Sequence, residues 1–399
     1  NGRRPAHRRE AATAVPSPMA IEVDALVAGA GPAGSVSALL LARAGWRVVL
    51  ADGGPSDRLK TCGHCLGARV LSLLDTLGLR DPVESITTDR TSHVRIWMSG
   101  RPVLESRLAT GTGDHVAHAG TGRVVDRRRL DPLLRALACG AGAALWSPAH
   151  VQAPELERDG CRVRVRRDDR EVAVSARLLV IADGIGSGLV RALHWSRPRP
   201  RARCCGVSFD LPAEAVPAES LTAGTISMHL GRCGYLGQVR QRNHVHVAAL
   251  VRGGHPLESA MDEFRAELPW LPGSMRQAEG FVATGPLPWA AERVAAPGVA
   301  VVGDAAGSPE PLTGEGMSWA IESAAFLAAS INADSTPGFD ARAAARYTAA
   351  WNAHIHAGLR RCALLSRALE HPRVLGACSR LASRIPRLPE FIVRTVVPA

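Results

Sequence analysis

The stretch from Val299 to Met317 reads Val-Ala-Val-Val-Gly-Asp-Ala-Ala-Gly-Ser-Pro-Glu-Pro-Leu-Thr-Gly-Glu-Gly-Met. Its apolar run stops at Gly303-Asp304, a proline-rich turn follows, and a helical pattern covers residues 318–332. The pattern predicts a strand, a carboxylate at its end, and a helix whose first N–H groups are free to face an electron-rich ligand. We therefore expect one part of a ligand site where this strand ends.

A second ligand-binding turn lies far upstream and reads Gly29-Ala-Gly31-Pro32-Ala33-Gly34. A strand-like run, residues 24–28, precedes it, and a helix-like run, residues 35–44, follows it. In such a GxGxxG turn the first glycine allows the tight turn, the second lets the backbone approach a pyrophosphate, and the third lets the helix pack on the strand. The pattern predicts a nucleotide site, and the alternative is a glycine-rich βαβ turn without a ligand.

Two more acidic residues stand at the ends of strand-like runs. Residues 47–51 end at Asp52, eighteen residues after Gly34, which is where a carboxylate that binds a ribose hydroxyl is expected. A buried run, residues 177–181, ends at Asp183-Gly184 and follows a half-exposed hairpin pattern over residues 161–166 and 171–175. Because ligands gather at the carboxyl edge of a parallel sheet, these strand ends together predict one large ligand there.

Length and charge narrow the class of protein. A chain of 399 residues, 46% of them hydrophobic, can form two packed domains, and no apolar run reaches the ~18 residues that a membrane span needs. The formal charge of +11 does not indicate a nucleic-acid partner, because the basic residues are scattered and only 4% of residues are aromatic. Nine cysteines without an export signal favour a reducing cytoplasm. No cysteine group has the second ligand pair of a structural zinc site, so no metal is expected.

Changes of pattern divide the chain into four parts. Residues 1–18 are rich in Arg, Ala and Pro and are expected to be a disordered extension or the product of an upstream start site. Residues 19–200 and 288–335 carry the nucleotide motifs, and residues 201–287 contain alternating stretches that predict an antiparallel sheet. Residues 336–399 have a helical pattern in which arginines interleave with Leu and Val. Contact with a membrane surface is one expectation for this part, and a simple helical cover is the alternative.

The order of the motifs matches a known family. GxGxxG at Gly29, Asp-Gly at Asp183 and Gly-Asp at Gly303 together resemble the FAD-dependent hydroxylase superfamily with the p-hydroxybenzoate hydroxylase type of fold, over about residues 20–330. The resemblance implies an α/β protein: a three-layer Rossmann-like FAD-binding domain of the glutathione reductase type, an inserted antiparallel β-sheet substrate domain, and a C-terminal helical segment. It also implies NAD(P)H or another electron donor and a lipophilic or aromatic small-molecule substrate.

The resemblance also assigns roles to single residues at the nucleotide end. Gly29, Gly31 and Gly34, with Pro32 and Ala33, would bind the FAD pyrophosphate, and Asp52 would bind the adenosine ribose. Asp183 and Gly184 would lie near the pyrophosphate. Gly303 and Asp304 would bind the ribitol or the pyrophosphate. Arg127, in an Arg-x-x-x-Asp pattern with Asp131, is a candidate FAD contact, and a solvated helix start is the alternative.

At the flavin end the resemblance points to the turn before the last long helix. Backbone groups of this turn would face N1 and O2 of the flavin, where negative charge grows on reduction and a helix N-terminus stabilises it. The residues concerned are Pro311, Thr313, Gly314, Glu315, Gly316 and Met317.

Several details favour the geranylgeranyl reductase branch, which saturates isoprenoid double bonds with reduced FAD. Gly307 follows Gly-Asp-Ala-Ala where aromatic hydroxylases usually have a histidine, and Glu315 stands where their turn more often has glutamine. Lys60-Thr-Cys62-Gly resembles the Lys-x-Cys-Gly run of this branch. The Tyr-x-Trp-x-Phe-Pro pattern typical of the branch is replaced by Gly234-Tyr235-Leu-Gly237, and halogenase signatures of the Trp-x-Trp-x-Ile-Pro type are absent.

Cys62, His64 and Tyr235 are the candidate catalytic side chains. In the reductase branch the cysteine lies near the flavin, so Cys62 would position the flavin or deliver a proton to the substrate carbon as hydride leaves N5; a small packing residue is the alternative. His64 could supply a proton near neutral pH, although an exposed position is the commoner one. The same holds for His244 and His246, which share one strand face. Tyr235 would line the substrate pocket.

We therefore predict a FAD-dependent oxidoreductase that reduces a carbon–carbon double bond of a lipophilic or polyketide-like substrate. One alternative is a monooxygenase that hydroxylates an aromatic or unsaturated substrate through a C4a-hydroperoxyflavin. A flavin-binding protein without turnover is the other. The prediction places the protein in the cytoplasm, with contact at the membrane surface as an option, and without a nucleic-acid partner.

Overall fold

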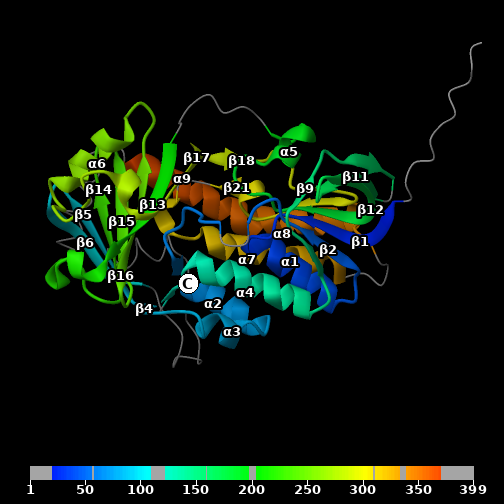
Figure 1. Cartoon of the computed structure of the whole chain (residues 1–399), viewed down its shortest axis with the longest axis horizontal. Helices are drawn as coiled ribbons and strands as arrows, with labels where there is room; N and C mark the ends of the chain where they lie inside the picture. The colour runs from blue at the N-terminus through cyan, green and yellow to red at the C-terminus, as the bar shows by residue number, and fades with distance from the viewer. Residues whose placement is uncertain are drawn as a thin grey trace, which may run out of the picture.

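The computed structural model describes residues 20–55, 58–108, 122–158, 160–196, 204–308, 311–332 and 338–369. The extension expected over residues 1–18 and the chain from residue 370 onward lie outside these ranges. The described residues form two large β-sheets, one toward each end of the long axis of the molecule, with long helices between and below them (Figure 1).

The first sheet has a parallel core. Its strands lie in the order β20 (Val299–Val301), β12 (Arg170–Ile181), β1 (Ile21–Ala28), β2 (Val48–Ala51) and β8 (Ala144–Trp146). These strands are rich in Val, Leu and Ala because both faces of such a sheet are covered. Helix α1 (Pro32–Arg43) packs against both α4 (Arg127–Gly140) and α7 (Gly316–Asn332). The strand, turn and helix predicted around residue 304 are present, and the helix begins at Gly316.

Strand β12 is long enough to take part in two kinds of pairing. Its first half pairs antiparallel with β11 (Gly160–Arg167), and its second half pairs parallel with β1. In β11 the residues Cys161, Val163 and Val165 are buried and the arginines between them are exposed, so the predicted half-exposed hairpin is confirmed. Three short strands complete this sheet: β9 (Ala149–Val151), β10 (Glu155–Glu157) and β19 (Ala295–Ala296).

The second sheet has seven strands and contains a segment from far upstream. Its order is β17 (Glu279–Leu287), β13 (Cys204–Pro212), β16 (His244–Val251), β15 (Gly234–Arg240), β14 (Thr225–Leu230), β5 (His93–Met98) and β6 (Arg101–Arg107). Only the β14–β5 pair is parallel among these described neighbours.

One face of the second sheet packs on helix α6 (Leu257–Arg265). Val207 and Phe209 of β13 form a core with Met261 and Phe264 of this helix. Because successive side chains of a strand point to opposite faces, Asp210 of β13 and the side chains of β16 in register with it point to the other face, toward the first sheet.

Shorter elements connect the two sheets. Strands β3 (Cys65–Leu66), β4 (Arg90–Thr91) and β7 (Gly122–Val124) form a small sheet, and β18 (Trp289–Ala290) pairs with β21 (Gly307–Ser308). The remaining short helices are α2 (Ala68–Thr76), α3 (Arg80–Glu84) and α5 (Gly188–Ala192). Single 3-10 turns span Ala213–Ala215, Ala218–Ser220, Met275–Gln277, Gly303–Ala305 and Pro311–Thr313.

The helical pattern predicted from residue 336 onward is present within the described residues, but it is interrupted. Helix α8 (Ala341–Trp351) is followed by a π-helical turn, Asn352–His356, and then by α9 (Ala357–Leu369). Within the described ranges no helix combines the length and the apolar character that a bilayer span requires.

Candidate functional site

A cavity of about 1070 Å³ runs from the carboxyl edge of the first sheet to the inner face of the second sheet. Gly29 follows β1, Asp183 follows β12 and Asp304 follows β20, and all three line this cavity. The sheet thus brings together the strand ends that the sequence singled out, as expected for parallel strands.

The GxGxxG turn is held by contacts that only glycine permits. Gly29 has a φ of 108°, and a Cβ on this residue would lie 2.3 Å from the carbonyl oxygen of Ala182. A Cβ on Gly34 would lie 1.8 Å from the carbonyl oxygen of Gly29. The backbone at Gly31 stays open to the cavity, where an added Cβ would meet the Lys60 ammonium at 3.5 Å. Helix α1 begins directly after it, so free N–H groups and a cation stand together, as a pyrophosphate requires.

Asp52 and Asp183 line the cavity on either side of this turn. The Asp52 carboxylate lies 3.7 Å from Nη1 of Arg135. Burial raises the pKa of Asp183, although the Ser187 hydroxyl and the backbone N–H of Leu189 donate hydrogen bonds to its carboxylate. Gly184 follows with a φ of 86°. Both carboxylates therefore line the same cavity as the GxGxxG turn.

Lys60 was not among the predicted binding residues, and it lines the nucleotide end of the cavity together with Arg58. Its Nζ lies 3.4 Å from Asp131. Burial lowers the pKa of Lys60, while the neighbouring Asp131 carboxylate acts in the opposite direction. Two signals in the sequence pointed to Lys60: it begins the Lys60-Thr-Cys62-Gly run, and it is the one lysine of a chain with 48 basic residues.

Arg127 and Asp304 both line the cavity, and both are desolvated there. Arg127, the first residue of α4, donates from Nε and Nη2 to the two carboxylate oxygens of Asp131 at 2.6 and 2.8 Å. Its side chain is only 14% exposed, so the solvated helix start considered as an alternative is wrong. Burial raises the pKa of Asp304, and the Arg127 guanidinium offsets part of this rise. A desolvated carboxyl group in the wall suits a hydroxyl-bearing ligand.

The turn that follows residue 310 borders the cavity at the start of α7. Thr313, Gly314, Gly316 and Met317 all contribute to the wall, and Gly314 has a φ of 70°. Pro311 begins this turn, and its side chain lies outside the described part. The N-terminal end of α7 thus stands at the cavity, as predicted.

Glu315, in the same turn, belongs to a second buried charge cluster. One carboxylate oxygen of Glu315 lies 3.6 Å from Nη2 of Arg69, which also pairs with Glu322 at 3.0 Å. Burial raises the pKa of Glu315. Burial also raises the pKa of Glu322 to about 7; the Arg69 guanidinium opposes this rise, and the Glu315 carboxylate adds to it. The cluster fixes the turn to α2, which carries Arg69.

Cys62 and Tyr235 both line the cavity, Cys62 from the loop before β3 and Tyr235 from β15 of the second sheet. The Cys62 thiol lies 3.9 Å from Sδ of Met317 and accepts the backbone N–H of His64 at 3.4 Å. Burial raises the pKa of this thiol, and the Arg127 guanidinium lowers it by a smaller amount. The thiol is therefore neutral at physiological pH. Tyr235 lies on β15, is 4% exposed and packs with Leu230 and Leu250.

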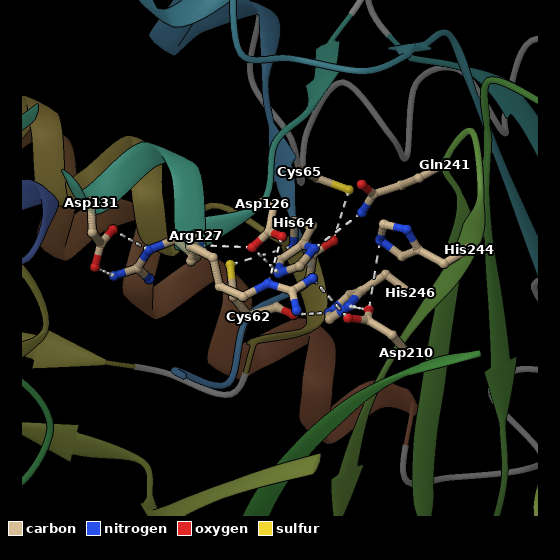
Figure 2. A network of polar contacts seen from close by, with 12 residues as sticks. Cys62, His64, Cys65, Asp126, Arg127, Asp131, Asp210, Gln241, His244 and His246 are labelled. Carbon is tan, nitrogen blue, oxygen red and sulfur yellow. Dashed lines mark hydrogen bonds and ion pairs between the residues drawn. The ribbon is translucent and has the colours of Figure 1, made fainter. Parts of the chain in front are cut away.

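His64 and His246 are buried, so the exposed positions expected from the sequence are wrong. They are 5% and 4% exposed, and their rings stack with centroids 3.5 Å apart and planes 12° apart (Figure 2). The expectation failed because the face of β16 that carries His246 packs against the loop of Cys62 instead of facing solvent. His244, two residues earlier, is half-buried.

Beyond Tyr235 the wall of the cavity is apolar. Strands β5, β6 and β14 supply most of it, through Val94, Ile96, Leu104, Ile226, Met228 and Leu230. The Gln238 amide is the polar exception on the neighbouring strand β15. The cavity therefore has a polar end, which is compatible with phosphate groups, and an apolar end.

These features fit FAD in the polar part. The close backbone contacts at Gly29 and Gly34, the open backbone at Gly31, the cation of Lys60 and the start of α7 are what a flavin dinucleotide needs. A family model described as a FAD binding domain matches residues 22–268. The chain belongs to this family. It is a FAD-dependent oxidoreductase with the p-hydroxybenzoate hydroxylase type of fold.

Two of the relatives of this chain are reductases. The chain is 28% identical to the menaquinone reductase of Mycolicibacterium smegmatis over 406 aligned positions, which cover 95% of this chain and 92% of the relative. It is 24% identical to the digeranylgeranylglycerophospholipid reductase of Methanococcus vannielii, with 75% of this chain and 74% of the relative covered.

The fold is shared with a solved structure of a geranylgeranyl bacteriochlorophyll reductase-like protein from Thermoplasma acidophilum. The TM-score is 0.73 at 17% identity, with 94% of this chain and 99% of the other covered.

Proposed function

We propose that this oxidoreductase saturates a carbon–carbon double bond in a lipophilic, isoprenoid-bearing substrate. The observation that carries the proposal is the apolar half of the cavity, which continues from the flavin end, at Cys62 and Met317, into a wall of aliphatic side chains on the second sheet. An extended hydrocarbon chain gains about 25 cal/mol for each Å² that such a wall removes from water. The names of the two reductase relatives support the same substrate class.

Bound FAD, once reduced, supplies a hydride to one carbon of the double bond. The residues of the chain bind and orient the partners. The N-terminal end of α7, at Gly316 and Met317, would offer backbone N–H groups to the electron-rich edge of the flavin. Asp304 and Lys60 would bind the polar part of the cofactor. The aliphatic wall excludes water from the reacting carbons.

Cys62 is the proposed source of the proton that the second carbon needs. Its burial keeps the thiol protonated, and its place beside Met317 puts it at the junction of the polar and apolar halves of the cavity. Arg127 approaches the same sulfur and stabilises the thiolate left after proton transfer. A general acid of this kind typically contributes 10²–10⁴-fold to a rate.

The proposal extends to the surroundings of the substrate. Tyr235 is proposed to line the substrate end. NAD(P)H or another donor would reduce the flavin. Helix α9 carries Arg360, Arg361 and Arg367 among apolar residues, and it is proposed to touch the membrane surface from which a lipophilic substrate is drawn.

The experiment is product analysis with the FAD-loaded protein, dithionite as reductant and menaquinone in detergent micelles as probe, without oxygen. A digeranylgeranylglycerophospholipid is the second probe. The extracts are exposed to air before mass spectrometry, because a quinol then returns to the quinone whereas a saturated double bond persists. The proposal expects a lasting gain of two hydrogen atoms.

A product that forms only when oxygen is admitted, and that carries an oxygen atom from it, would instead establish the monooxygenase alternative. Asp304→Ala serves as the control for cofactor dependence. We expect this variant to be purified without flavin and without activity.

A further inference from the structure

Both ring nitrogens of His246 face hydrogen-bond acceptors. Nδ1 lies 2.6 Å from a carboxylate oxygen of Asp210, and Nε2 lies 2.6 Å from the backbone carbonyl oxygen of Cys62 (Figure 2). A neutral imidazole carries one N–H, so it can donate to only one of these oxygens. Both short contacts are satisfied at once only when both nitrogens carry a proton.

The proton belongs to His246 and not to Asp210. Burial alone would raise the pKa of Asp210, but the hydrogen bond from His246 and the nearby cations outweigh it, and the net pKa is lowered. Arg128 donates to the second carboxylate oxygen of Asp210 at 3.1 Å. His244 stands 3.8 Å from Asp210, beyond hydrogen-bond distance. Asp210 is therefore an ionised acceptor for both His246 and Arg128.

His64, stacked on His246, is neutral. Its Nδ1 lies 3.1 Å from the amide nitrogen of Gln241, which donates, so the ring proton sits on Nε2. Burial and the charge of His246 hold the pKa of His64 well below its ordinary value, with Arg127 and Arg128 contributing in the same direction. The stacked pair thus carries a single positive charge, on His246.

The charges around the pair agree with this assignment. Asp126 and Asp210 bring two negative charges, and Arg128 contacts both of them, at 2.7 and 3.1 Å. Arg127 forms an ion pair with Asp131, and Lys60 forms a second ion pair with the same carboxylate. Glu279 of β17 lies opposite Asp210 in the sheet and is exposed. Arg128 balances one of the two negative charges of Asp126 and Asp210, and a protonated His246 balances the other.

A metal ion does not explain the cluster. His64, Asp210 and His246 offer ligand atoms within 4.8 Å of one another. However, two ligands each about 2.0–2.2 Å from a zinc ion in tetrahedral geometry stand well over 3 Å apart, whereas Nδ1 of His246 and the Asp210 oxygen are separated by 2.6 Å. The contact is that of a charged hydrogen bond.

We propose that His246 is a positioning residue: as an imidazolium held by Asp210, it binds the Cys62 carbonyl across the junction of the two domains and so fixes the Cys62 thiol in the cavity wall. The proposal deepens the function proposed above, since it assigns the support of the proposed proton donor. Loss of one proton from His246 breaks one of its two short hydrogen bonds.

The kinetic test compares His246→Gln and Asp210→Asn with His244→Gln, because His244 lies on the same strand face but makes no hydrogen bond to Cys62. His246→Gln is expected to lower kcat by about 10- to 100-fold, the range expected when a reacting group is misplaced by about 1 Å, with FAD occupancy and KM unchanged. Asp210→Asn, which removes the charged acceptor of His246, is expected to lower kcat in the same way. His244→Gln is expected to stay within about twofold of the parent protein. A folded His246→Gln variant with the parent kcat would overturn the proposal.

The structural test does not depend on turnover. The FAD-loaded protein, labelled with ¹⁵N in its histidine rings, is studied by NMR at neutral pH, and the His246 signals are assigned by their loss in His246→Gln. Both ring nitrogens of His246 are expected to be protonated in the parent protein and only one in Asp210→Asn. A neutral His246 ring in the parent, or stoichiometric metal in the purified protein, overturns the inference. If both nitrogens are protonated but no tested substrate is reduced, the inference on His246 stands and the proposed reaction fails.

Discussion

Replacing Glu322 by glutamine should stabilise the protein at alkaline pH and leave it nearly unchanged at acidic pH. Glu322 is 7% exposed and shares Arg69 with Glu315, and burial raises its pKa from the ordinary 4.5 to about 7. The unfolded chain ionises this group near pH 4.5, whereas the folded chain resists ionisation until about pH 7. Folding stability is therefore lost between these two pH values.

The rise in pKa corresponds to about 3 kcal/mol, at 1.36 kcal/mol for each pH unit. Glutamine removes the ionisation but also the ion pair with Arg69, which keeps Glu315 as a partner. We expect Glu322→Gln to gain about 1–3 kcal/mol over the parent protein at pH 8, and to differ from it by less than about 1 kcal/mol near pH 5.

The assay is urea unfolding of the FAD-loaded protein at both pH values, followed by tryptophan fluorescence. Glu171→Gln is the matched control, because this glutamate on β12 is 52% exposed and its replacement should change stability by less than about 0.5 kcal/mol at either pH. A Glu322→Gln variant whose difference from the parent is the same at both pH values would refute the reasoning.

Three further predictions concern the cavity. Gly34→Ala should yield protein without bound flavin, measured by absorbance after purification, because its Cβ would lie 1.8 Å from a backbone oxygen; normal occupancy would contradict the packing described. Cys62→Ser should keep FAD and lower kcat by about 10²-fold or more, since a hydroxyl is a far weaker acid; an unchanged kcat would remove Cys62 from the mechanism. Met228→Trp should raise KM for menaquinone at least about tenfold without loss of FAD, because the indole fills the apolar half; an unchanged KM would place the substrate elsewhere.

The polar half of the site could be predicted from the sequence because its residues lie at strand ends. Gly29, Asp183 and Asp304 each follow an apolar run. Parallel strands bring their carboxyl ends to one edge of the sheet, and this does not depend on how the rest of the chain packs. The hairpin of β11 and β12 could also be predicted, since alternation of Arg with Cys or Val reports a half-exposed strand directly.

The interdomain network could not be predicted in this way. The alternation of β16 shows that His244 and His246 share a face, but not that the Cys62 loop covers that face. Likewise, β5 and β6 extend the second sheet although more than a hundred residues separate them from most of its strands. Such long-range pairings depend on tertiary packing, which local patterns do not report.

The central claim, reduction of a carbon–carbon double bond in the apolar half of the cavity, is tested most directly by a single anaerobic turnover. The protein is loaded with FAD, reduced with one equivalent of dithionite and mixed with menaquinone or the geranylgeranyl lipid, while flavin absorbance and product mass are measured in the same sample. The account predicts that oxidised flavin returns without oxygen, with one saturated double bond formed for each flavin. Flavin that stays reduced until oxygen is admitted, followed by a product that contains oxygen, would contradict it.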